Sequence, residues 1–114
     1  MAEWAKIDVN FLRHPQVIGL KPQDQLAFLA LILYAMEYET DGDIPAACLP
    51  ACNVTTKSTA ALERARLISQ TDDGWHVDGF TRKQRTRQEL DAERKANRER
   101  AQAMRQRKSM RLVS

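Results

Sequence analysis

The residues with the clearest chemical potential are the lysines and arginines in the last part of the chain. From Phe80 to Ser114 there are twelve Lys and Arg against four Asp and Glu, a net charge of +8. Such side chains bind phosphates through charge-assisted hydrogen bonds and release counterions when they do so. The residues that we expect to approach phosphates are Arg82, Lys83, Arg85, Arg87, Arg94, Lys95, Arg98, Arg100, Arg105, Arg107, Lys108 and Arg111.

A solvated helix is the alternative for this basic segment. Its acidic residues, which end at Glu99, can form ion pairs with arginines three or four positions away. A coiled coil is disfavoured, because the heptad positions Leu90, Asn97 and Met104 are interrupted by charged residues. We therefore expect a helical extension as far as about Ala103 that is frayed thereafter.

The preceding part of the chain has the opposite charge. Up to Gly79 it has six Lys and Arg against eleven Asp and Glu, a net charge of −5. This composition predicts a small domain at 1–79 and a basic arginine-rich arm at 80–114. The longest apolar run, from Leu26 to Met36, is shorter than the roughly 20 residues that cross a membrane. The first six residues do not have the pattern of a signal peptide, so we expect a cytoplasmic protein with no membrane partner.

Periodicity and turn residues predict the elements of the domain. Pro22 and Asp24 favour the start of a helix that continues to Met36 and is packed on several sides. The other expected elements are an edge strand at 4–8, a turn at 41–43 before a short strand at Ile44, a short helix at 45–52, a helix at 55–66, and a hairpin of 67–70 with 75–77. This is the order of a winged helix-turn-helix. The predicted fold is mainly α with a small β-hairpin, followed by a basic helical extension.

In a winged helix-turn-helix, the helix before the hairpin presents its exposed side to a DNA groove. Lys57 and Arg64 lie seven residues apart and so share a face of this helix. The candidates for contact with duplex DNA are Thr56, Lys57, Thr59 and Arg64, and the alternative is that these are ordinary solvent-facing residues. The hairpin tip opposes close approach to DNA, because Asp72 and Asp73 would repel phosphates.

Cys48 and Cys52 would share a helix face, but a zinc site would also require His14 and His76 to converge. Two reduced, half-buried thiols are the favoured interpretation. The sequence has neither a glycine-rich phosphate loop nor an evident nucleophile beside a histidine. We therefore expect no enzymatic activity, no metal and no cofactor.

Several short motifs resemble those of a family of small phage-encoded proteins, typical of phages of actinobacteria and usually described as helix-turn-helix proteins or replication initiators (replisome organisers). The motifs are Trp4-Ala5-Lys6-Ile7-Asp8 with Phe11 and His14-Pro15, Asp41-Gly42-Asp43-Ile44-Pro45, Ala61-Leu62-Glu63-Arg64-Ala65, Trp75-His76-Val77-Asp78-Gly79-Phe80, and Gln84-Arg85-Thr86-Arg87 leading into 93–100. The resemblance implies a winged-helix domain that acts in phage DNA replication or transcription control, in the cytoplasm of a host bacterial cell.

Two classes of function follow from these patterns. In the first, the winged helix reads duplex DNA and the basic arm contacts phosphates. In the second, the winged helix is a protein-interaction or oligomerisation module that binds a host or phage protein through its acidic body or wing, and a homo-oligomer belongs to this class. RNA is a lesser option, because arginines alone do not distinguish duplex DNA from structured RNA.

Overall fold

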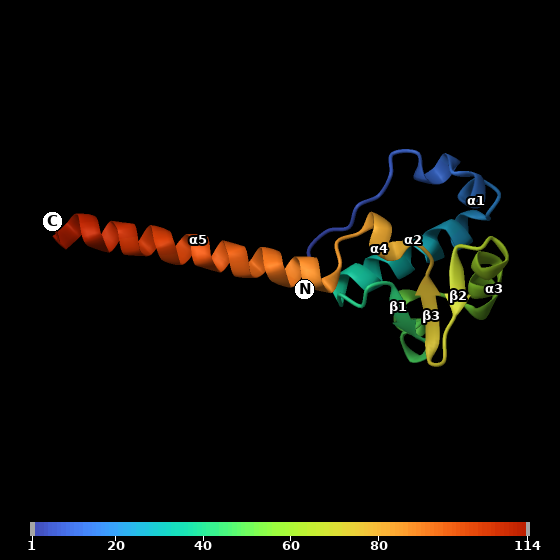
Figure 1. Ribbon diagram of the computed structural model, residues 1–114. Coiled ribbons are helices and arrows are strands. Elements are labelled where there is room, and N and C mark those ends of the chain that lie inside the picture. Colours follow the sequence, from blue (N-terminus) through green and yellow to red (C-terminus); the bar gives the residue numbers. More distant parts are fainter. Residues whose placement is uncertain (1, 114) are drawn as a thin grey trace. The chain divides into compact units, whose positions relative to one another are not determined.

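The computed structural model describes the backbone of residues 2–113 and the side chains of residues 2–110. It is mainly helical with a small antiparallel sheet of three strands, which confirms the mainly α class expected from the sequence (Figure 1). The elements in chain order are η1 Phe11–Arg13, α1 Pro15–Ile18, α2 Pro22–Glu37, β1 Asp43–Pro45, η2 Ala46–Cys48, η3 Pro50–Cys52, α3 Thr56–Arg64, β2 Ile68–Gln70, β3 Gly74–Val77, α4 Phe80–Lys83 and α5 Arg87–Val113, where η denotes a 3₁₀-helix.

The chain divides into two compact units, Met1–Gln84, here called the body, and Arg85–Ser114, here called the arm. The division therefore falls after Gln84 rather than after Gly79, where the charge changes sign. The reason is that Phe80 and Gln84 are both buried, so α4 belongs to the body although it is basic. With this division the body has eight Lys and Arg against eleven Asp and Glu, and the arm has ten against four.

The core of the body forms around α2. Pro22 occupies the first turn of this helix, and Leu31 and Ala35 are fully buried in its middle. The expectation that α2 is packed on several sides is wrong, because Leu26 and Leu33 on its other side are largely exposed. A body of this size covers one side of the helix and leaves an apolar strip on the opposite side.

A buried polar contact joins α2 to α3. The Ser58 hydroxyl donates a hydrogen bond of 2.8 Å to the Asp24 carboxylate, and these residues are only 3% and 7% exposed. Thr55 caps α3, since its hydroxyl accepts from the Ser58 amide at 3.2 Å. A buried carboxylate is stable only when its hydrogen bonds are satisfied, so this contact fixes the start of α3 against α2.

The sheet has the order β1-β3-β2, with Ile44 opposite Trp75 and Ile68 opposite Val77. The expected strand at Ile44 and the expected hairpin are therefore both present. Gly74 is required at the start of β3, because a Cβ there would lie 2.1 Å from the carbonyl oxygen of Ile44. The absence of a side chain at Gly74 therefore allows the backbones of β1 and β3 to approach closely at this point.

The N-terminal segment differs from the sequence expectation. Residues 4–8 do not form a strand, and Trp4 is more than half exposed. The backbone of Lys6 instead bonds to the side-chain amide of Gln84, whose Oε1 accepts from the Lys6 amide at 2.8 Å while its Nε2 donates to the Lys6 carbonyl. A buried glutamine thus takes the place that a neighbouring strand would have occupied.

The arm is helical over a longer range than the sequence suggested. Thr86 immediately precedes α5 and its hydroxyl accepts from the Glu89 amide at 3.1 Å, and the helix continues to Val113. The expected fraying after Ala103 is not seen. Residues 101–113 contain mostly Ala, Gln, Met, Arg and Lys and neither glycine nor proline, and these are good helix formers.

We predict that Ser58→Ala lowers the free energy of unfolding by about 1–3 kcal/mol, because it leaves the Asp24 carboxylate buried without its hydroxyl donor. The measurement is urea denaturation followed by circular dichroism. Ser69→Ala is the matched control, since Ser69 donates to Asp78 at 2.7 Å in an exposed pair and its loss should change stability by about 0.5 kcal/mol or less. Equal losses for the two variants would contradict the role assigned to the buried contact.

Candidate nucleic-acid interface

Four arginines follow one side of α5. Arg87, Arg94, Arg98 and Arg105 are separated by seven, four and seven residues. These intervals are close to whole turns of an α-helix, so the four side chains form one line about 27 Å long at a rise of about 1.5 Å per residue. Such a line can meet several phosphates of one backbone.

A second group of cations lies on the other side of the same helix. Arg100 comes two residues after Arg98, about 200° further around the axis, and Arg107 follows seven residues later. Lys95 and Lys108 lie at intermediate angles, and the side chain of Arg111 is outside the described residues. The arm therefore presents positive charge around most of its circumference.

Ion pairs within the arm are concentrated in its first half. Arg85 contacts Glu93 at 2.7 Å, and Arg94 contacts Asp91 at 3.1 Å, three residues away. Pairs as exposed as that of Arg94 and Asp91 contribute only about 0–1 kcal/mol, so phosphate can compete for such an arginine. Arg85 is different, because its side chain is only 18% exposed, and its predicted role in phosphate contact loses support.

The second half of the arm carries the greater excess of charge. Residues 100–114 contain five Lys and Arg and no Asp or Glu, whereas residues 85–99 contain five against four. The described side chains of residues 100–110 are all exposed. Self-repulsion among these cations is relieved when an anionic partner binds.

In α3 the predicted contact residues do not all lie on the accessible side. Thr56, Lys57 and Arg64 are exposed, as expected. The placement of Thr59 on this face is wrong, because Thr59 is only 4% exposed and its hydroxyl donates to the Thr56 carbonyl at 2.9 Å. The preceding turn of the helix satisfies this hydroxyl, so it is not available to DNA.

Arg82 and Lys83 belong to the body and not to the arm. They lie in α4 and line a cavity that Lys6 and Arg66 also line. Sequence reasoning assigned Arg82 and Lys83 to the arm and did not consider Lys6 and Arg66, which are separated from them by long stretches of chain. Only the folding of the N-terminal segment onto α4 brings the four cations to one cavity.

The hairpin tip is acidic in the structure as well as in the sequence. Asp72 and Asp73 are both exposed between β2 and β3. The tip is ordered by the Thr71 hydroxyl, which accepts from the Gly74 amide at 3.1 Å and donates to Asp73 at 3.2 Å. This end of the sheet therefore repels phosphates.

The two cysteines remain free thiols and are half-buried. The Tyr34 hydroxyl donates to Cys48 Sγ at 3.1 Å; this hydrogen bond is the main cause that raises the pKa of Tyr34 to about 12, and burial adds to it. Burial likewise raises the pKa of the Cys52 thiol, which favours the protonated, less reactive form. Neither histidine points to these thiols, since His76 contacts Asp43 at 2.7 Å and His14 accepts from the Gln16 amide.

Two further features of residues 2–113 bear on the class of function. In this range no group of three or more His, Cys, Asp and Glu is arranged to hold a metal ion. No helix within the same range has both the length and the apolar character that a membrane span requires. Comparison of the chain with known protein families, with curated proteins and with solved structures gave no match.

Proposed function

We propose that this protein binds nucleic acid, with duplex DNA as its partner and the arm as the principal phosphate-binding element. The observation that carries the proposal is α5 itself, a helix with a line of four arginines and an acid-free second half. Electrostatic attraction to the polyanion supplies affinity that falls steeply with salt and is nearly independent of sequence. Its Arg side chains also suit bidentate contact with phosphate oxygens.

We further propose that the body is a winged helix-turn-helix of the replisome-organiser type and acts in phage DNA replication or transcription control. In support, α2, β1, the η2–η3 turns, α3 and the β2–β3 hairpin follow one another in the expected order, and β1 pairs with β3. In this proposal α3 is the recognition helix, and Thr56, Lys57 and Arg64 face the groove. The acidic hairpin tip stays away from the phosphates.

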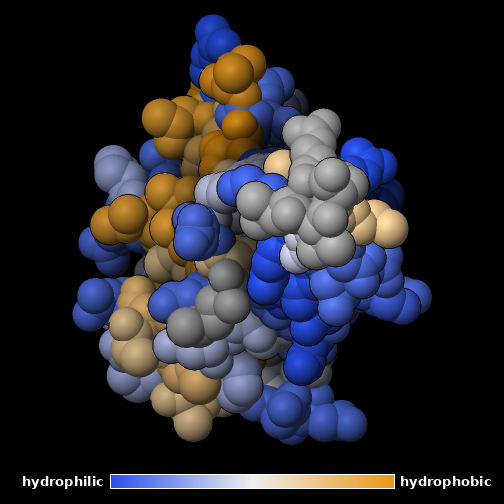
Figure 2. Space-filling view, turned by 90° about the vertical axis from the view of Figure 1, so that its left-hand side faces the viewer, coloured by the Kyte–Doolittle hydropathy of each residue, from blue (hydrophilic) through white to orange (hydrophobic). Residues whose placement is uncertain are grey.

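A protein-interaction module is the second candidate, and an exposed apolar patch favours it. The patch consists of Ile7, Val9, Leu12 and Leu26, and Val9 is 99% exposed. Ile7, Val9, Leu12 and Leu26 line a common shallow depression with Pro22 and Leu29. On the face of the molecule drawn in Figure 2, hydrophobic residues gather at the upper left. Patches of this kind mark sites of protein association.

The first test neutralises the second half of the arm. Arg100, Arg105, Arg107 and Lys108 are changed together to Gln, which retains helix propensity and removes four charges. We expect the dependence of log K on log salt for a duplex to become shallower by about 2–4, since each lost phosphate contact removes about 0.9. Fluorescence anisotropy at several salt concentrations provides the measurement.

The matched control for this test replaces the three arginines by lysine and so preserves their charge. It should retain the salt dependence of the parent chain, because counterion release depends on the number of phosphates neutralised. An unchanged salt dependence in the Gln variant would refute the role of the arm.

The second test concerns sequence preference. Lys57→Ala combined with Arg64→Ala should reduce discrimination between a selected duplex and a scrambled one by about tenfold or more, since a good contact to a base edge contributes about 1–3 kcal/mol. The preferred duplex is first selected from a random library. Arg13→Ala combined with Lys21→Ala removes the same charge from exposed positions outside α3 and should leave discrimination intact. Retained preference in the α3 variant would exclude α3 as the recognition helix.

The third test addresses the protein-interaction candidate. If the patch associates, sedimentation velocity should detect an oligomer or complex that persists in high salt, and Leu12→Ser with Leu26→Ser should abolish it. Ile18→Ser is the control, because Ile18 is equally exposed but does not line the depression. A monomer at all concentrations and no captured partner would count against this candidate.

A further inference from the structure

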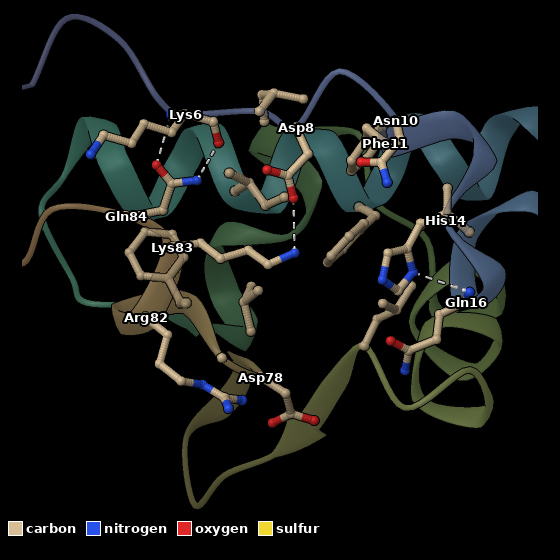
Figure 3. Close-up of a pocket in the computed structure, with 18 of the residues that line it drawn as sticks. Lys6, Asp8, Asn10, Phe11, His14, Gln16, Asp78, Arg82, Lys83 and Gln84 are labelled. Carbon is tan, nitrogen blue, oxygen red and sulfur yellow. Dashed lines mark hydrogen bonds and ion pairs between the residues drawn. The ribbon is translucent and has the colours of Figure 1, made fainter.

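The body contains a cavity of about 490 Å³, which is within the range of about 300–1,000 Å³ typical of small-molecule sites. The N-terminal segment from Lys6 to Gln16 lies along one side of it, and Val77–Gln84 lies along the other (Figure 3). Phe28 and Ile32 of α2 are also among its lining residues. None of its lining residues belongs to α3 or α5.

The inner part of the cavity is apolar and partly aromatic. Phe28, Val77 and Phe80 are buried, whereas Phe11 is only half-buried. The rings of Phe11 and Phe28 are stacked, with centroids 5.7 Å apart and planes 11° from parallel. This geometry offers a flat apolar surface on which a planar ring can stack.

The rim of the cavity is cationic, in contrast to the rest of the body. Four of the eight Lys and Arg of the body line it, namely Lys6, Arg66, Arg82 and Lys83, but only two of the eleven Asp and Glu do so. Both acids have partners, because Asp8 contacts Lys83 at 3.1 Å and Asp78 accepts from the Ser69 hydroxyl. An anion approaching this acidic body therefore meets net positive charge at the cavity.

The walls of the cavity are held in place by contacts between distant segments. Gln84 bonds both backbone groups of Lys6, and Gln16 Nε2 donates to the Ala65 carbonyl at 3.0 Å. His14 accepts the Gln16 amide at Nδ1, so the neutral ring carries its proton on Nε2 as a donor. The site is thus formed before a ligand binds, which lowers the entropy loss on binding.

We propose that this cavity binds one nucleotide, with the base stacked on Phe11 and the phosphate at Arg82 on the rim. A nucleotide joins the two chemistries that the cavity offers, a planar ring for the aromatic floor and an anion for the cationic rim. The guanidinium of Arg82 lies over Gly79, where an added Cβ would be 3.0 Å from its Nη2. The nucleotide is a free mononucleotide or an unstacked residue of a single strand.

Nucleotide binding in the cavity rests on the proposed nucleic-acid function. It adds a contribution to affinity that depends on the base, which the arm does not supply. The probe is single-stranded oligothymidylate of about 15 nucleotides, compared with an abasic strand of equal length and charge. The full-length chain should bind the thymidylate about tenfold or more tightly than the abasic strand, since stacking of one base contributes about that factor.

Phe11→Leu keeps the apolar volume and removes the ring, so it should bring the two strands to nearly equal affinity. Arg82→Gln should weaken binding of the thymidylate, whereas Arg13→Gln, which removes an exposed body charge outside the cavity, should affect both strands alike. The Gln variant of the arm should weaken both strands equally and preserve their ratio. Unchanged duplex binding in the Gln variant, with the preference for thymidylate over the abasic strand still present, would reject the arm and retain the cavity.

Amide chemical shifts of the parent chain provide a readout that does not depend on a variant being folded. Addition of the thymidylate should shift the resonances of Asn10, Gly79 and Lys83, which line the cavity. Shifts with thymidine monophosphate alone would identify the free nucleotide as the ligand, and shifts with the strand only would identify the unstacked residue. Equal affinity for the two strands, with shifts confined to α3 and α5, would overturn the proposal.

Discussion

Moving a guanidinium or ammonium group out of water costs more free energy than the packing of its side chain can offset, unless an anion is buried with it. The ten cations of the arm face only four acids, so α5 has almost nothing that it could bury in a core. The apolar residues before Gln84 must therefore build the core without it. This constraint explains why the chain separates into an apolar-centred body and a helix most of whose side chains, with the exception of Leu90, are exposed to solvent.

The same constraint explains which parts of the fold could be predicted. The long apolar run of α2 and the turn between the two strands of the hairpin are local signals, and each led to the observed element. The length of α5 could also have been inferred, because helix propensity alone favours residues 101–113. The error there came from treating a charge-rich segment without a core contact as frayed.

The sequence-based predictions that were wrong share a different cause. Each concerned a feature that depends on contacts between segments far apart in the sequence. Residues 4–8 alternate like a strand, yet the side chain of Gln84, 78 positions from Lys6, satisfies that backbone. Thr59 was placed outward by helical spacing alone, but it is buried together with its neighbour Ser58, which bonds to Asp24 of α2. The cationic rim around Arg66 and Arg82 could not be found from the sequence, because no local pattern relates its members.

The distribution of charge also determines how two binding elements can act on one polyanion. The body has a net charge of −3 and the arm has +6, so a nucleic acid is attracted by the arm and repelled by most of the body. Asp72 and Asp73 add to this repulsion at the hairpin tip. The cavity rim is the part of the body where the local sign is reversed. In the proposed function, contacts of the arm depend on the number of phosphates and weaken with salt, whereas the proposed stacking on Phe11 depends on the base and is largely insensitive to salt. Raising the salt concentration should therefore shift the balance of affinity from the arm to the body, and the selectivity for unpaired bases should rise as the total affinity falls.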